Sequence, residues 1–382
     1  MSAEGRKILA DSMANGCRLL LAVCFVFSGF VKAVDPVGTQ IKLQDYFFAF
    51  GLDSISDSNT LLMACLLAGI EFLFGIYLLL GVYRRGTSVA VLVLMLIFTP
   101  LTLYLAVKNP VSDCGCFGDA IILTNWQTFG KNVVLLFAAV CLAVMHERVR
   151  PFISERRAWA VPLISVLLIG HFMISNLRYL PVFDFRPYKV GTDLRKGALE
   201  GADDSFSDFA LLDADMNDVT DSVLTAPGYT FLLIAPYLEE ASQENIDVVN
   251  DLYYYCLAND YRMLCVTASS HDGIERWKDI TFAEYNFLSA DEIPLRTMVR
   301  ANPGIVLLNA GVIVAKWNAG NVPIDLNFGE KLEHLVKSHP FLDSRLGRIL
   351  NVTLYFILPY LLLLLIDMGR RRTERSKDGT IE

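Results

Sequence analysis

The residues best suited to chemistry are two cysteines, Cys114 and Cys116, separated by one glycine. They stand in the segment 113–119, Asp-Cys-Gly-Cys-Phe-Gly-Asp, between two apolar runs that are each long enough to cross a bilayer. A thiolate is the nucleophile of disulfide exchange. A disulfide across one intervening residue departs from relaxed geometry, and strained disulfides are the labile, more oxidising kind. Gly115 gives the backbone the freedom that such a turn needs, so the segment predicts a redox-active pair.

Two other interpretations of the pair stay open: a fixed structural disulfide, and half of a metal site. The flanking Asp113 and Asp119 oppose reactivity, because negative charge raises the pKa of a thiol. A helix expected to begin near residues 125–127 favours a thiolate if its N-terminus lies nearby. No histidine is close to the pair in the sequence, which disfavours metal, and no metal site is predicted.

The composition indicates a membrane protein with one polar domain. The chain has 382 residues, of which 54% are hydrophobic and only 19% charged, whereas about 25% charge is usual for soluble domains. The polar stretch 181–345 is long enough for one globular domain. Six apolar runs have the length of a membrane span: 14–34, 60–82, 87–107, 127–146, 159–179 and 349–367.

Lys and Arg are concentrated in alternate loops, which predicts the orientation. The positive-inside rule then places both termini in the cytoplasm, and the Cys-Gly-Cys segment and the 181–345 domain on the opposite side. No small-residue cleavage site follows the first run, so we interpret it as an uncleaved anchor. We expect a bacterial inner membrane, whose outer side lets disulfides persist. The basic residues behind this prediction are Arg6, Lys7, Arg84, Arg85, Arg148, Arg150, Arg156, Arg157, Arg370, Arg371, Arg372, Arg375 and Lys377.

Glu71 lies about halfway along the second apolar run. A carboxylate is costly in lipid, so it should face the interior of the bundle and find a partner, and Lys32 and Tyr104 are the candidates. Its role is either a structural clamp or a proton- or quinone-linked function. Four cysteines within apolar runs are expected to be small apolar filler: Cys17, Cys24, Cys65 and Cys141.

The motifs of residues 14–146 together resemble the DoxX/MauE group of membrane proteins. The resemblance rests on three elements: Ser28-Gly29 with Lys32 and Asp35-Pro36, then Glu71 with Leu79-Leu80-Gly81 and Arg84, then Cys114-Gly115-Cys116-Phe117-Gly118. It implies a four-helix membrane module that handles disulfides together with periplasmic thioredoxin-like partners, and relatives linked to quinone-coupled oxidation. The segment 36–58 is expected to form an amphipathic element at the outer interface.

The polar domain alternates strand and helix patterns. It carries 13 Lys and Arg against 26 Asp and Glu, a formal charge of −13, which argues against nucleic acid or anionic headgroups as partners. The pattern predicts an α/β fold with a mixed sheet. The expected strands are 229–235, 261–268, 305–308 and 312–317, and the expected helices are 240–258, 271–280 and 294–299.

This domain resembles a thioredoxin fold of the TlpA type. Pro236 and Tyr237 match the lead-in to the family's active site, and Pro303 matches its cis-proline. Leu238 and Ala241 stand where the two active cysteines should be, so the resemblance implies a module that binds rather than reacts. We expect Cys256 and Cys265 to be buried free thiols, with a disulfide between them as the alternative, and we expect His271 and Trp277 to be structural.

The predicted fold class is therefore a membrane α-helical bundle, a four-helix DoxX/MauE-like module plus two further spans, with an extracytoplasmic α/β thioredoxin-like domain. The predicted parts are 1–150, 151–180, 181–345 and 346–382. The leading function is thiol-disulfide handling, with a periplasmic thiol/disulfide protein as partner. The alternatives are a non-enzymatic assembly factor for an envelope client and, with least support, a small-molecule transporter. Whether the chain is an enzyme stays open. No cofactor motif is evident, and a quinone is the candidate carrier.

Overall fold

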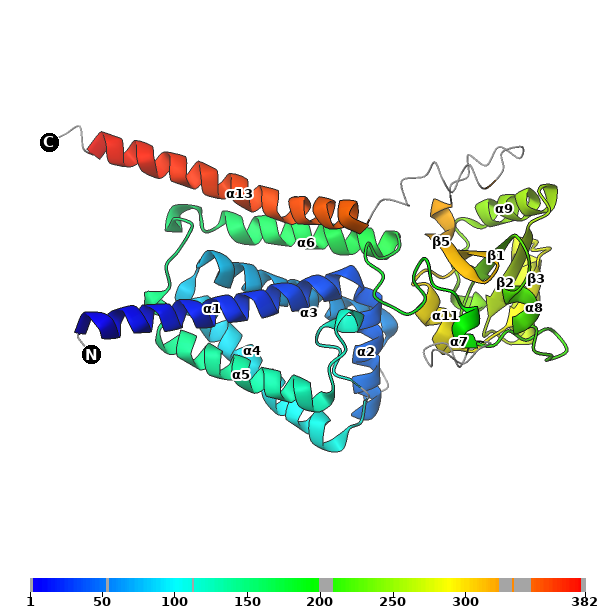
Figure 1. Ribbon diagram of the computed structural model, residues 1–382, viewed down its shortest axis with the longest axis horizontal. Coiled ribbons are helices and arrows are strands. Elements are labelled where there is room, and N and C mark those ends of the chain that lie inside the picture. The colour runs from blue at the N-terminus through cyan, green and yellow to red at the C-terminus, as the bar shows by residue number, and fades with distance from the viewer. Residues whose placement is uncertain are drawn as a thin grey trace. The chain divides into compact units, whose positions relative to one another are not determined.

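The computed structural model describes residues 3–52, 55–111, 113–198, 209–322, 332 and 345–378. The chain divides into two compact units. One comprises the chain up to Leu177 together with the part from Arg345 onward, and the other runs from Arg178 to Ser344. The first unit is helical, and the second contains a β-sheet (Figure 1).

Six helices in the described part of the chain are long and apolar enough to cross a membrane. This confirms the six predicted spans, and the protein is an integral membrane protein. The helices are α1 (Ala3–Val34), α3 (Asp57–Leu80), α4 (Arg84–Lys108), α5 (Asn125–Val144), α6 (Ala160–Arg178) and α13 (Arg345–Asp378).

Helices α1 and α3 pack closely because glycines stand at their contact. A Cβ atom at Gly29 would lie 2.4 Å from the backbone nitrogen of Phe72, and one at Gly75 would lie 2.5 Å from that of Val26. Small residues allow membrane helices to approach to backbone contact. This approach brings Lys32 of α1 opposite Glu71 of α3.

The segment between α4 and α5, residues 109–124, is called the Cys loop below. It contains the short 3₁₀ helix η1 (Gly118–Ala120), and Thr124 closes it with a capping box at the start of α5. The neighbouring helix α2 (Pro36–Ala49) begins with an Asp35 N-cap and a proline in its first turn. The helical part of the amphipathic element predicted over 36–58 is thus α2.

Ion pairs gather at the end of the bundle opposite the Cys loop. Arg148 pairs with Asp11 of α1 at 2.8 Å, and Arg157 pairs with Asp367 of α13 at 2.6 Å. Asp367 is fully buried. These contacts place the first part of α1, the segment before α6 and the last part of α13 at one end of the bundle, as the prediction of same-side termini requires.

The second unit is built on a five-stranded mixed sheet of order β3-β2-β1-β4-β5. Strands β1, β2 and β3 are parallel, whereas β4 pairs antiparallel with β1 and β5 antiparallel with β4. The predicted mixed sheet is confirmed. The strands are β1 (Tyr229–Ile234), β2 (Arg262–Thr267), β3 (Asn286–Ser289), β4 (Gly304–Asn309) and β5 (Val312–Asn318).

Alternate residues of the central strands pack into two hydrophobic cores, one on each face of the sheet. Phe231 and Leu233 belong to one core, and Leu232 and Ile234 to the other. Helices α9 (Ile246–Ala258) and α10 (His271–Thr281) cover the first face, and α8 (Thr220–Leu224) and α11 (Glu292–Met298) cover the second, while α7 (Arg195–Ala198) precedes them in the chain.

The structure of this unit departs from the sequence predictions at one strand and at one helix start. The edge strand β3 was not predicted. Helix α9 begins at Ile246 rather than at 240, because a 3₁₀ turn, Leu238–Glu240, comes first. Cys256 and Cys265 are both buried and free, so the buried-thiol prediction is confirmed and the disulfide alternative is wrong. The stretches 199–208, 323–331 and 333–344 of the predicted domain lie outside the described residues.

Candidate functional site

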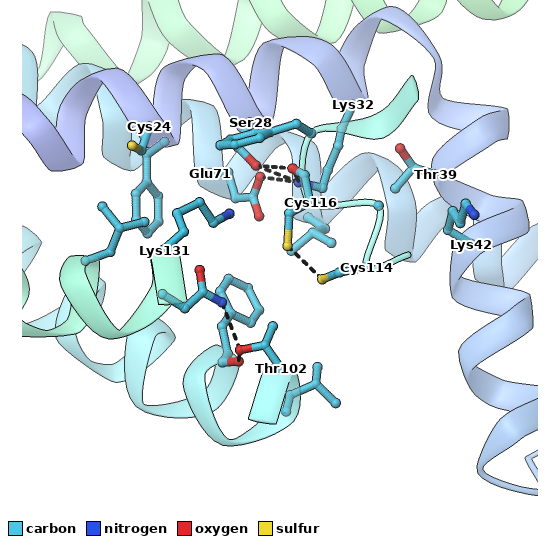
Figure 2. A pocket seen from close by; sticks show the side chains of 18 of the residues that line it. Cys24, Ser28, Lys32, Thr39, Lys42, Glu71, Thr102, Cys114, Cys116 and Lys131 are labelled. Carbon is cyan, nitrogen blue, oxygen red and sulfur yellow. Dashed lines mark hydrogen bonds and ion pairs between the residues drawn. The ribbon is translucent and has the colours of Figure 1, made fainter. Parts of the chain in front are cut away.

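The Cys loop brings its two sulfurs together. Cys114 Sγ and Cys116 Sγ are 2.7 Å apart, and both thiols are free. Gly115 makes the turn between them with φ +61°, a left-handed conformation that favours glycine. Its N–H donates to Asp113 Oδ1 at 2.9 Å, which closes the turn. Only a small displacement of the two sulfurs separates this geometry from a disulfide (Figure 2).

Lys32 ties the Cys loop to α1 and α3. Its ammonium donates to Ser28 Oγ at 2.7 Å, to Glu71 Oε2 at 2.8 Å and to the carbonyl oxygen of Cys116 at 2.8 Å, which uses all three of its N–H groups. The side chains of Lys32 and Glu71 are only 5% and 7% exposed. Lys32 is therefore the partner of Glu71, and Tyr104, which is 40% exposed and packs on Phe50, is not.

Helix α2 holds the other half of the loop. The Tyr46 hydroxyl donates to the carbonyl oxygen of Cys114, and Lys42 Nζ pairs with Asp113 Oδ2 at 2.8 Å. Lys42 thus offsets the negative charge of Asp113, which would otherwise raise the pKa of the nearby thiols. The carbonyl groups of Cys114 and Cys116 are therefore anchored to different helices, α2 and α1.

A cavity of about 160 Å³ opens beside the thiols. Lys131 of α5 lies in its wall, with its ammonium 4.2 Å from the centre of the Phe117 ring, and that ring packs edge-on against Phe27. Figure 2 shows the ammonium pointing toward the Cys116 side of the cavity. Apolar side chains form most of the remaining wall: Phe25, Leu43, Leu67, Met95, Phe98, Leu101 and Leu135.

The surroundings give the two thiols opposite acidities. The hydrogen bond from the Cys114 thiol, together with the ammonium groups of Lys131 and Lys32, lowers the pKa of Cys116 to about 6, although burial acts in the other direction. The hydrogen bond that it gives to Cys116, together with burial, raises the pKa of Cys114. These surroundings therefore favour a thiolate on Cys116 over one on Cys114.

The sequence missed three residues of this site: Lys131, Tyr46 and Lys42. Lys131 had a detectable signal, because it is the one lysine inside the apolar run 127–146 and intramembrane charges are commonly functional. The N-terminus of α5 is occupied by its own capping box, in which Gln127 N–H donates to Thr124 Oγ1 at 3.3 Å. Positive charge near the thiols comes instead from lysine side chains. Among the described residues, no three His, Cys, Asp or Glu side chains are grouped to hold a metal ion.

The second unit also gathers the residues predicted for it, at the end of β1. The Asn302–Pro303 peptide bond is cis, and Asn302 Nδ2 donates to the carbonyl oxygen of Tyr237 at 2.9 Å. Leu238 and Ala241 are buried there. Pro236, Tyr237 and the cis-proline Pro303 together form what is called the cis-proline frame, which matches the surroundings of a thioredoxin-like site. Leu238 and Ala241 occupy its two cysteine positions, so no thiol stands at either.

Comparisons with known proteins agree with this division. Residues 10–146 match the family model described as methylamine utilisation protein MauE. This helical region is similar to that family, and the strand order and cis-proline give the second unit a thioredoxin-like arrangement.

Among solved structures, the solution structure of a candidate protein disulfide isomerase from Bacteroides thetaiotaomicron is 17% identical. The alignment covers 36% of this chain and 89% of that one, with a TM-score of 0.26. No curated protein matches the chain.

Proposed function

We propose that this protein is a thiol-disulfide exchange component of a bacterial inner membrane and that Cys114 and Cys116, at the outer face, are its redox pair. One observation carries the proposal: the sulfurs lie 2.7 Å apart, while the carbonyl groups of the same residues are fixed by Tyr46 and Lys32. A loop anchored through its backbone keeps its shape whether the sulfurs are bonded or free. A pair that cycles between the two states needs that property.

The exchange step follows from the acidities of the thiols. The Cys116 thiolate attacks a disulfide of the partner, so that a Cys116–partner bond forms and the partner's second sulfur leaves as a thiolate. Cys114 then loses its proton and attacks the Cys116 sulfur, which releases the partner's first sulfur. The partner gains two electrons, and Cys114 and Cys116 end as a disulfide. The reverse sequence oxidises a partner dithiol.

The thioredoxin-like unit fits a docking role in this scheme. Its frame at the end of β1 is retained, but the buried Leu238 and Ala241 remove dithiol chemistry. The placement of this unit and of the Cys loop on the outer side rests on the positive-inside rule. The partner class is then a periplasmic thiol/disulfide protein or an envelope client.

A quinone is the proposed electron carrier in the membrane, and the cavity beside Cys116 fits its chemistry. Most of the wall is apolar, while Lys131 and Asn132 supply polar groups suited to a carbonyl oxygen. When bound, a quinone would supply two-electron oxidising capacity. These residues would bind and orient the ring.

The second candidate function is a non-enzymatic assembly factor in which Cys114 and Cys116 form a permanent disulfide. The thiol-free end of β1 favours it, because such a unit can bind a client without reacting.

The test uses the full chain in intact membranes. Reduced and oxidised glutathione are applied in turn, free thiols are trapped with a membrane-impermeant maleimide, and the labelled peptides are identified by mass spectrometry. We expect the pair to be labelled from the outer side after reduction and protected after oxidation. A pair that excess reduced glutathione leaves oxidised contradicts the exchange function and favours the assembly factor. Labelling only from the cytoplasmic side contradicts the orientation.

A further inference from the structure

The charges lining the cavity do not balance. Three lysines, Lys32, Lys42 and Lys131, face it. Lys32 is paired with Glu71 and Lys42 with Asp113, both at 2.8 Å. Lys131 forms no ion pair with any residue that the structure describes, and its ammonium rests on the Phe117 ring instead. The cavity therefore holds one positive charge without a carboxylate to offset it.

A half-buried ammonium in a largely apolar wall favours an anion nearby, because an uncompensated charge is costly away from water. The anion that the site itself can produce is the thiolate of Cys116. Cys116 lines the same cavity and directly precedes Phe117, whose ring holds the ammonium on that side. The cation–π contact with that ring stabilises the lysine side chain in this position.

We propose that Lys131 is the counter-ion of the Cys116 thiolate and that, together with the hydrogen bond from Cys114, it makes reduction of the Cys114–Cys116 disulfide a one-proton event. This inference rests on the proposed redox function and deepens it. The S–S bond breaks, and two electrons arrive from a partner dithiol, which becomes a disulfide and gives up two protons. One proton goes to Cys114 and the other to solvent, because Cys116 stays a thiolate beside Lys131.

The remaining groups around Cys116 leave the role to Lys131. On α1 and α3, the charges of Lys32 and Glu71 offset each other, and the same holds for Lys42 of α2 and Asp113 of the loop. The α4 residues in the wall carry no charge. The titratable and charged groups facing Cys116 or lining the same cavity are Cys24, Lys32, Lys42, Tyr46, Glu71, Asp113, Cys114 and Lys131.

The first test is the pH dependence of the reduction potential of the pair, measured on the full chain in membranes. With one proton taken up, the equilibrium constant for reduction changes tenfold per pH unit between pH 7 and 8, which is 29.6 mV for a two-electron couple. Lys131→Met should steepen this toward the hundredfold, or 59 mV, of a two-proton event, and Lys131→Arg should keep the wild-type slope. Lys108→Met, an exposed lysine at the end of α4, is the matched control and should also keep it. A hundredfold slope in the wild-type protein, or an unchanged slope in Lys131→Met, overturns the inference.

The second test does not require the pair to exchange. In a Cys114→Ser background, the serine hydroxyl retains a donor to Cys116, and no disulfide between 114 and 116 can form. We expect Lys131→Met to slow the alkylation of Cys116 by iodoacetamide at pH 7 by about tenfold, the effect of losing most of the thiolate, and Lys131→Arg to restore it. Equal alkylation rates in Cys114→Ser and in Cys114→Ser with Lys131→Met refute the counter-ion role. Slowed alkylation alongside a wild-type pair that never exchanges would instead refute the proposed function alone.

Discussion

The Cys loop of the bundle and the end of β1 in the thioredoxin-like unit both hold their backbones in a defined shape, but they carry different side chains. In the Cys loop, two free sulfurs meet beside a lysine, and hydrogen bonds from two helices hold the loop. At the end of β1, a cis-proline frame surrounds the buried Leu238 and Ala241. The second unit has no thiol at either position where its resemblance to thioredoxin-like proteins places a cysteine, whereas the Cys loop has two free thiols. A fold supplies positions, and the side chains placed there supply the chemistry.

The largest effect is expected from removing either sulfur of the Cys loop. Cys114→Ser and Cys116→Ser should each abolish the glutathione-dependent cycling of the site, because a disulfide needs both partners. The measurement is the alkylation pattern after alternating reduction and oxidation. Cys65→Ala, within α3, is the control and should cycle normally. Cycling that survives loss of Cys116 would place the redox pair elsewhere.

Breaking the buried pair beneath the loop should strongly destabilise the bundle. Lys32→Met leaves Glu71 buried without a partner, and removing one member of a buried pair typically costs about 3–5 kcal/mol. Thermal unfolding in detergent measures the loss. The exchanged pair Lys32→Glu with Glu71→Lys should recover much of it. Lys42→Met, in the more exposed pair with Asp113, should cost no more than about 1 kcal/mol. Equal losses for the two lysines would contradict the account of the site.

Adding a single methyl group at the contact between α1 and α3 should destabilise the bundle. Gly29→Ala adds a Cβ atom 2.4 Å from the Phe72 nitrogen, so backbone must shift, and overpacking of this kind costs about 1–3 kcal/mol. Gly16→Ala, in the same helix, meets nothing within 4 Å and serves as the control. The same unfolding assay compares them, and a Gly29→Ala protein as stable as Gly16→Ala would show that the close approach is absent.

The smallest effect on the bundle should come from restoring thiols to the second unit. Leu238→Cys with Ala241→Cys rebuilds a Cys-x-x-Cys pair at the end of β1. We expect these two thiols to form a disulfide detectable by mass, and the potential of the Cys114–Cys116 pair to stay unchanged. A mixed disulfide between one of these new cysteines and Cys114 or Cys116 would show that the two sites exchange electrons in this chain, and the docking proposal would then become one of electron transfer between them.

Much of the fold could be predicted from the sequence, because the length of the apolar runs indicates the spans and the alternation of strand and helix patterns indicates the α/β unit. The six spans and four of the five strands were predicted, with most bounds within a few residues, but α1 begins at Ala3 rather than at 14 and α13 ends at Asp378 rather than at 367. The four-residue edge strand β3 was missed because so short a run has little periodicity. The early start expected for α9 ignored the turn at 238–240, where Ser242 N–H bonds to the carbonyl oxygen of Asn302, 60 residues away in the chain.

Only part of the site could be predicted from the sequence. A carboxylate inside a span needs a partner, and Lys32 was predicted for this reason. Lys131 was missed because a lysine near the end of a span ordinarily extends to the interface. Only the folded path of the Cys loop, which lays Phe117 under its ammonium, turns it toward Cys116. Tyr46 and Lys42 reach the loop across about 70 residues of chain, a pairing that periodicity does not encode.

The proposed exchange between the Cys114–Cys116 pair and a partner requires a reduction potential that a partner can reach. This potential is measured in intact membranes by differential alkylation across a graded glutathione series. We expect the pair to titrate between about −120 and −270 mV, the range of exchange catalysts. A pair that remains oxidised below about −300 mV behaves as a structural disulfide, and the exchange function would then be wrong.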